Sequence, residues 1–234
     1  ISLCEIPNLI ERSQFNKRRK KLFLFSEQIR TKLAAQFLRF EDYFIIDSMP
    51  LEICKFSRHS RIKICKDDFE TAPSKGFCAS QNNWFFGYKL HGVCSVTGVF
   101  HSLDITKAEV HDVHFLKNIK QQMSDCVLLG DRGYLSESIQ LDLFQSVNIK
   151  LETPKRMNQL NYKPQPYIFR KSRKRIETLF SQLCDQFLIR RNYAKTFKGF
   201  KTRILAKITA LTLVQYINKF IFDIPINKIK NQLI

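Results

Sequence analysis

Two short runs of aliphatic and aromatic residues each lead into an aspartate, and this feature constrains the fold more than any other. The first run, "YFIIDSMP" (43–50), is interpreted as a buried strand that stops before Pro50, with Asp47 at its end. The second, "DCVLLGDRGY" (125–134), is interpreted as another buried strand that leads into Asp131. In α/β sheets, functional side chains gather at strand ends, where they leave the core. Two such strands lying side by side would bring the two carboxylates together.

The rest of the pattern predicts an α/β protein with a mixed central sheet. The predicted elements are two strands within 83–105 around a Thr97-Gly98 turn, helices at 108–122 and 136–146, a strand at 148–154, and long helices at about 168–190 and 199–221. This order of elements favours a sheet that is covered by helices on both faces.

Three regions are expected along the chain. Residues 1–40 form an N-terminal helical segment, in which a basic run precedes apolar residues at helical spacing: Leu22, Phe25, Ile29, Leu33 and Phe37. Residues 41–222 form the main domain, with a polar insertion or loop at 54–82, and 223–234 form a C-terminal tail. Because the chain begins with Ile1 rather than Met, the original N-terminus is expected to be missing.

The charge balance points to a polyanionic partner. Lys and Arg outnumber Asp and Glu 39 to 21, which gives a net charge of +18. Nucleic acid is favoured, because phosphate neutralisation supplies most non-specific affinity, and an anionic membrane surface is the alternative. Residues 204–222 are apolar but contain Lys207 and Lys219, so they are interpreted as a buried helix rather than a membrane span. The seven scattered cysteines fit a reduced, cytoplasmic location.

Asp47 and Asp131 together suggest a metal site. Two close carboxylates repel each other unless a cation lies between them, and Mg²⁺ prefers oxygen ligands. Gly130 and Gly133 flank Asp131, so the backbone there can turn sharply. The alternative is that each aspartate is a polar residue ending a strand and beginning a turn.

A third acid, Glu177, lies on the predicted helix at 168–190, beside an apolar stripe and facing inward at its edge. It is the only acid of that helix before Asp185. An ion pair with Arg173 or Lys174 is the alternative to metal binding. Residues 150–208 contain 16 Lys and Arg against 3 acids, interleaved with aromatic residues, as expected for a nucleic-acid surface. The candidate DNA-binding residues are Arg170, Arg173, Lys174, Arg190, Arg191 and Lys198.

Five motifs occur in the order found in DDE transposases of bacterial insertion sequences, which this chain resembles, specifically the insertion sequence 982 type. They are "FIIDSMPLEICK", "FFGYKLHGVCSVTG", "AEVHDVHFL", "LLGDRGY" and "RKRIETLFSQL". The resemblance implies an RNase H-like catalytic domain at 41–222 preceded by the remnant of a DNA-binding region. It implies that Asp47, Asp131 and Glu177 are catalytic ligands of two Mg²⁺ or Mn²⁺ ions. It also implies cleavage of element ends, joining to target DNA, and a dimer on DNA.

Two positions depart from a wider pattern of this superfamily. Arg170 stands where a tyrosine is common, seven residues before the glutamate, and Cys184 stands where a lysine is common, seven after it. The alternatives are a structure-selective nuclease without strand transfer and an inactive DNA-binding remnant. His91 is expected to be structural, and Asp112 in "HDVH" is expected at a helix start, where the dipole favours an acid.

Overall fold

The computed structural model describes residues 10–155, 162 and 164–230. Its centre is a mixed sheet in the order β4-β3-β1-β5-β6. The strands are β1 (Tyr43–Cys54), β3 (Asn83–Ser95), β4 (Phe100–Lys107), β5 (Cys126–Leu129) and β6 (Ile149–Glu152). Neighbours among β4, β3 and β1 are antiparallel, whereas β1, β5 and β6 are parallel. The predicted fold class, a mixed α/β sheet flanked by helices, is confirmed.

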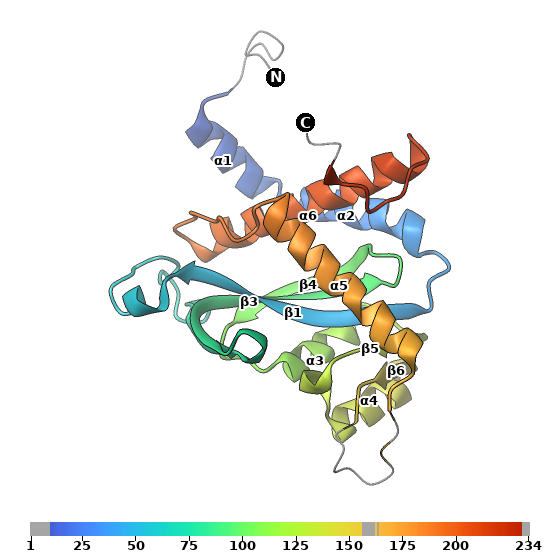
Figure 1. The fold of residues 1–234 in the computed structure, drawn as a ribbon. Helices are drawn as coiled ribbons and strands as arrows, with labels where there is room; N and C mark the ends of the chain where they lie inside the picture. Colours follow the sequence, from blue (N-terminus) through green and yellow to red (C-terminus); the bar gives the residue numbers. More distant parts are fainter. Residues whose placement is uncertain (1–9, 156–161, 163, 231–234) are drawn as a thin grey trace.

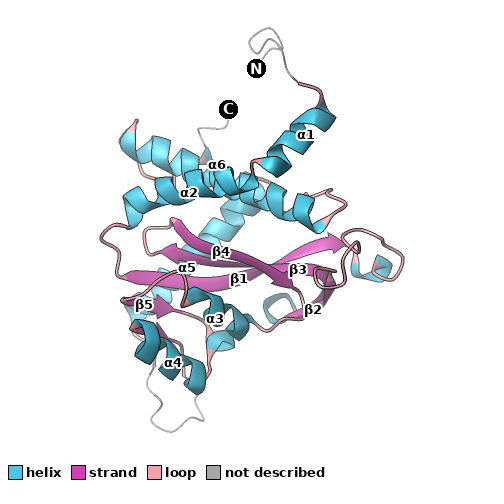
Figure 2. Cartoon of the chain, turned by 180° about the vertical axis from the view of Figure 1, so that it is seen from behind, coloured by secondary structure: helices cyan, strands magenta, loops and turns pink. Residues whose placement is uncertain are grey.

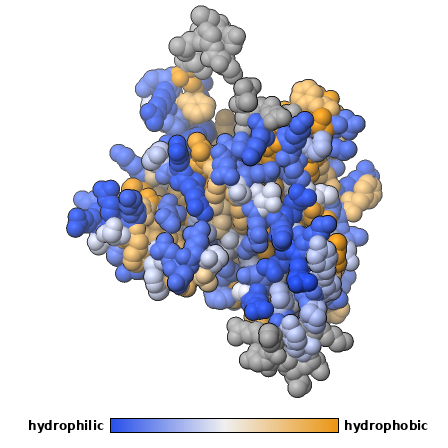
Figure 3. All heavy atoms as spheres, in the orientation of Figure 1, coloured by the Kyte–Doolittle hydropathy of each residue, from blue (hydrophilic) through white to orange (hydrophobic). Residues whose placement is uncertain are grey.

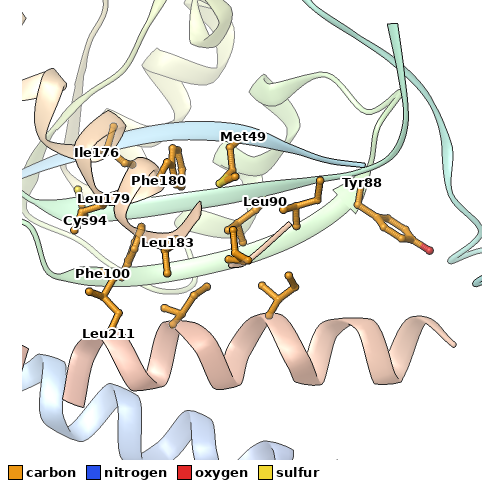
Figure 4. Packing of buried hydrophobic residues seen from close by; sticks show 14 of the residues in the cluster. Met49, Tyr88, Leu90, Cys94, Phe100, Ile176, Leu179, Phe180, Leu183 and Leu211 are labelled. Carbon is orange, nitrogen blue, oxygen red and sulfur yellow. The ribbon is translucent and has the colours of Figure 1, made fainter. Parts of the chain in front are cut away.

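Helices cover both faces of the sheet, as predicted (Figures 1 and 2). On one face, α5 (Tyr167–Asp185) and α6 (Phe197–Phe220) pack over β1, β3 and β4, and Figure 4 shows part of this buried cluster. On the other face, α3 (Phe115–Ile119) and α4 (Glu137–Val147) enclose a second cluster around Tyr134. Odd and even residues of one strand enter different clusters, as the period of two requires: Ile45 enters the first and Ile46 the second.

β1 differs from the predicted strand in its length. It continues through Pro50 to Cys54, so Asp47 lies near its middle rather than at its end. The reason is that β5 pairs with β1 only over Tyr43–Ile45, whereas β3 pairs along the whole of β1. Pro50 therefore lies where β1 has a partner on one side only, a position in which the missing N–H group is tolerated.

The N-terminal region contains α1 (Arg12–Lys21), which has no buried residue, and α2 (Phe23–Leu38), which packs on α6 and β4. The predicted apolar stripe is only half correct: Leu22, Phe25 and Ile29 are exposed, whereas Leu33 and Phe37 are partly buried. Arg30 and Ala34 face the molecule instead. Arg30 is buried because its guanidinium donates to the carbonyls of Phe100 and His101, 3.0 Å each, and pairs with Glu27.

The region 54–82 is not only a loop, because it contains β2 (Ser74–Cys78), which extends the sheet by pairing with the first residues of β3. The helix predicted at 108–122 is also shorter. β4 runs to Lys107, a 3₁₀ turn covers Asp112–His114, and α3 follows. Asp112 is held there by Lys89, whose Nζ lies 3.0 Å from its Oδ1. In the part of the chain that the structure describes, no helix combines the length and apolarity needed to cross a membrane.

Candidate active site

Asp47 on β1 and Asp131 just after β5 occupy equivalent positions relative to the pairing of these two parallel strands. Ile45 of β1 pairs with Leu129 of β5, and each aspartate lies two residues further along its chain. Ile45 and Leu129 both pack in the cluster beneath α5. The two acids therefore leave the sheet at the same place, where β5 ends, and on the side that α5 covers. The sequence predicted this proximity, although Asp47 is not at a strand end.

The electrostatics of Asp47 follow from this placement. Its side chain is partly buried, and its Oδ1 accepts a 2.8 Å hydrogen bond from the Ser48 amide. Burial, and after it repulsion from Asp131, raises the pKa of Asp47 from the ordinary 3.8 to about 7, against the lowering effects of the Ser48 amide and Arg173. An ionised Asp47 is thus costly unless a cation approaches it.

Two glycines and a buried tyrosine fix Asp131. Its Oδ1 accepts a 2.8 Å hydrogen bond from the Gly133 amide, and a Cβ at Gly133 would lie only 3.0 Å from that oxygen. A Cβ at Gly130 would lie 3.3 Å from side-chain atoms of Ile46 and Tyr134, which is tighter than most contacts. Tyr134 is fully buried under the turn. The backbone after β5 therefore holds the Asp131 carboxylate at the surface of a packed turn.

A cavity of about 430 Å³ opens beside Asp131. It is lined by Asp131, Arg132, Pro154, Lys155, Tyr162, Pro164, Gln165, Arg170 and Arg173. Four of these side chains are cationic and one is acidic. The cavity thus combines one carboxylate with four cationic side chains, as expected for a site that binds a metal ion and a phosphate together.

Glu177 differs from the other two acids. Its side chain is exposed rather than inward-facing, because Ile176, Leu179 and Phe180 take the buried side of α5. It follows Arg173 by four residues, so the two lie on the same side of the helix. Among residues 10–155, 162 and 164–230, no three His, Cys, Asp or Glu side chains are grouped closely enough to hold a metal ion. The structure brings Asp47 and Asp131 together, and Glu177 remains outside the pair.

The six candidate DNA-binding residues form two groups. Arg170 and Arg173 line the cavity at Asp131, and Lys174 is exposed beside them. Arg190 and Arg191 are exposed between α5 and α6, and Lys198 is exposed at the beginning of α6. From Lys174 to its end at Asp185, α5 runs for about 17 Å at a rise of about 1.5 Å per residue. The surface over α5 is mainly hydrophilic (Figure 3).

Asp112 is a neighbour of the site that the sequence did not indicate. Its charge contributes to raising the pKa values of Asp47 and Tyr134. No spacing rule could have identified it, because the contact depends on how the turn before α3 meets the turn after β5. His91 is structural, as expected. It is buried, its Nε2 lies 2.8 Å from Thr106 Oγ1, and its ring stacks on Phe115 at 5.0 Å.

Comparison with known proteins gives a family and distant structural neighbours. The curated proteins searched contain no match. Two solved structures, "Mos1 transposase paired-end complex with left transposon end" and "Crystal structure of the Mos1 mariner paired end complex with Mn", are 11% and 13% identical to this chain, each with a TM-score of 0.27. Each alignment covers 89% of this chain and 63% of the other chain, so this chain spans less than two thirds of their length.

The family match covers the central part of the chain. Residues 39–213 match the family described as Transposase DDE domain. The matched range includes the two paired aspartates, the cavity beside Asp131, α5 with Glu177 and most of α6. Since it covers well over half of the 234 residues, the chain belongs to the Transposase DDE domain family.

Proposed function

We propose that this chain is a DNA transposase that cleaves the ends of a mobile element and joins them to target DNA. The observation that carries the proposal is the placement of Asp47 on β1 and Asp131 just after β5, each two residues beyond the pair Ile45–Leu129 and next to a basic cavity. Family membership supports it. We further propose that the mobile element is a bacterial insertion sequence of the 982 type. The protein would act in the cytoplasm in association with DNA, and it would bind DNA as a dimer.

The residues at the site suit a hard divalent cation. Asp47 and Asp131 offer carboxylate oxygens, and the raised pKa of Asp47 is the response of an acid that lacks a neutralising partner. Asp47 and Asp131 would hold Mg²⁺ or Mn²⁺, with Glu177 as the third ligand once its exposed side chain turns towards them. Two such ions would supply Lewis acidity, activating a water or a 3′-hydroxyl and stabilising the leaving oxygen.

The other residues of the site act on the substrate by charge and position. Arg132, Lys155, Arg170 and Arg173 line the cavity and would neutralise the phosphates on either side of the reacting bond. Phosphoryl transfer requires in-line positioning and charge stabilisation rather than a covalent intermediate with the protein. The same site can therefore carry out hydrolysis and then strand transfer, depending on which oxygen attacks.

The test is the variant Asp131→Asn, with Asp185→Asn as the matched control, because Asp185 is exposed at the end of α5 and does not line the cavity. We expect Asp131→Asn to lower Mg²⁺- or Mn²⁺-dependent cleavage at least about 100-fold while DNA binding persists. The control should cleave normally. Cleavage that survives in Asp131→Asn would remove Asp131 from the reaction.

A second assay separates transposition from the two alternative functions. The wild-type protein is supplied with a pre-cut DNA end that carries a free 3′-hydroxyl, together with a target plasmid. Joined products are expected. Cleavage of an intact substrate without joining would identify a nuclease, and DNA binding without either reaction would identify an inactive remnant.

A further inference from the structure

A second basic cavity, of about 310 Å³, lies between α1 and the beginning of α6. In Figure 1, α1 stands above the N-terminal part of α6. Four cationic side chains line the cavity: Arg19 and Lys20 from α1, Lys195 from the preceding loop, and Arg203 from α6. Within the described part of the chain, no Asp or Glu lines it, and it shares no residue with the cavity at Asp131. The packing of α1 on α6 thus brings like charges together.

Among the residues that the structure describes, no acidic side chain forms an ion pair with the cations of this cavity. Arg19 Nη2 donates to Asn16 Oδ1 at 3.0 Å, but its buried Nε has no hydrogen-bond partner among the described residues. Burial, followed by repulsion from Arg203, lowers the pKa of Arg19. Lys207, one turn beyond Arg203, has its pKa lowered by burial and by repulsion from Arg203 and Arg19. An anion placed between the two guanidinium groups would relieve these costs.

The beginning of α6 adds to the positive potential. α6 has 24 residues, and its first turn is capped by Thr196, whose Oγ1 accepts from the Gly199 amide at 3.2 Å. The N-terminal end of a helix carries a partial positive charge and attracts anions. A Cβ at Gly199 would lie 3.3 Å from Lys20 Cε, so the glycine lets the Lys20 chain lie against this turn. Side-chain charge and helix dipole therefore act on the same space.

We propose that the cavity between α1 and α6 binds a backbone phosphate of DNA, at a second contact site separate from the candidate active site. This inference rests on the proposed function in that the polyanion is taken to be the DNA substrate. A duplex is favoured over a free small anion because exposed cations continue the surface on both sides, through Lys17 and Arg18 on α1 and Arg190 and Lys198 near α6. Tyr193, 79% exposed, lies at the same cavity and offers a surface for a sugar or base.

The site also gives the N-terminal helices a role. α1 buries no residue of its own, so the protein core does not hold it in place. A phosphate bound by Arg19 and Arg203 would connect α1 to α6, and DNA would thereby order the two helices relative to each other. α2 continues from α1 and packs on α6, so α1, α2 and α6 belong to one layer of the molecule.

The experiment compares Arg19→Gln and Arg203→Gln with Lys32→Gln, a matched loss of one charge at an exposed position of α2. Binding of a fluorescent duplex is followed by anisotropy over a range of salt concentrations, with a chelator present so that cleavage plays no part. We expect each cavity variant to bind about 5- to 10-fold more weakly and to lower the salt dependence by about one phosphate contact. Lys32→Gln should resemble the wild type more closely in both respects.

A second readout separates binding from a merely structural effect. Inorganic phosphate should raise the melting temperature of the wild type by about 2 °C or more above chloride at equal ionic strength, and should do so less in Arg19→Gln. Because Arg19 lies on α1, which has no buried residue, this variant is expected to fold even if Arg203→Gln does not. The proposal is overturned if Arg19→Gln binds the duplex with the affinity and salt slope of Lys32→Gln. Failure of the cleavage assay alone would leave this result unaffected, so the two proposals can fail separately.

Discussion

Replacement of Asp47 by asparagine should stabilise the metal-free protein while removing its response to metal. In the folded chain, burial and repulsion from Asp131 raise the pKa of Asp47 from 3.8 to about 7. A raised acid pKa means that the folded state binds the proton more tightly than the unfolded state. The stabilisation present below pH 3.8 is therefore lost as pH rises towards 7, and the full penalty applies above 7.

The magnitude follows from the size of the shift. A difference of about three pKa units at about 1.36 kcal/mol per unit gives an upper limit of about 4 kcal/mol. Since Asp47 is partly rather than fully buried, water reduces this penalty, and we expect Asp47→Asn to raise the free energy of unfolding by about 1–3 kcal/mol above pH 7. Asparagine keeps an oxygen for the Ser48 amide, so that hydrogen bond should persist.

The assay is urea unfolding of both proteins with a chelator and then with Mn²⁺. Mn²⁺ at about 100 times its dissociation constant should stabilise the wild type by about 2.7 kcal/mol and the variant much less. The difference between their free energies of unfolding should therefore become smaller or change sign. Asp185→Asn, at an exposed site, serves as the control and should change neither value by more than about 0.5 kcal/mol. If Asp47→Asn is no more stable than the wild type in the chelator above pH 7, the electrostatic account of the pair is refuted.

Two further variants test the fold around the site. Burial lowers the pKa of His91 from 6.5 to about 4, so its contribution to stability, up to about 3 kcal/mol, is present above pH 6.5 and lost as pH falls towards 4. Because Asp47 has the opposite pH dependence, the loss of stability due to His91 should be clearest in a protein that carries Asp47→Asn. Adding His91→Gln to that protein should abolish the loss. If the pH dependence of the unfolding free energy is the same with and without His91→Gln, the buried neutral state of His91 is contradicted. Arg30→Ala should lower the free energy of unfolding by about 2–4 kcal/mol, since it leaves the carbonyls of Phe100 and His101 without their donor. Lys32→Ala on the same helix should change the free energy of unfolding little. Equal effects of the two substitutions would show that the buried contacts of Arg30 do not stabilise the fold.

The sequence predicted those parts of the fold that depend on local pattern. The runs at Phe44–Ile46 and Val127–Leu129 are buried strands, and the stripe that includes Ile176, Leu179 and Phe180 is the buried face of α5. Apolar residues at a period of two or 3.6 indicate such elements because each must bury one face. The proximity of Asp47 and Asp131 followed from the same reasoning applied to two neighbouring strands.

The parts that were missed depend on pairing and contacts between distant segments. β1 extends through Pro50 because β3 supplies a long partner, and β2 forms within a polar stretch because it adds to the edge of β3. The first half of the apolar stripe of α2 was predicted on the wrong side because Arg30, a charged residue, finds carbonyl acceptors on β4 and is buried. A residue's own type does not reveal such partners.

The candidate site divides in the same way. The turn after β5 is specified locally by Gly130 and Gly133, so Asp131 was placed correctly beside its strand. The side of α5 on which Glu177 lies was predicted wrongly, because a residue at the edge of an apolar stripe can point inward or outward according to how the helix packs. The contribution of Asp112 arises from two turns that are separated by β5 in the chain.

Diffraction from crystals of this protein soaked in Mn²⁺, recorded where manganese scatters anomalously, tests the central claim most directly. The account predicts two anomalous peaks at the end of β5, with oxygens of Asp47, Asp131 and Glu177 at about 2.0–2.3 Å from them. Bound manganese that contacts neither Asp47 nor Asp131, or well-ordered carboxylates at that position with no peak beside them, would contradict it.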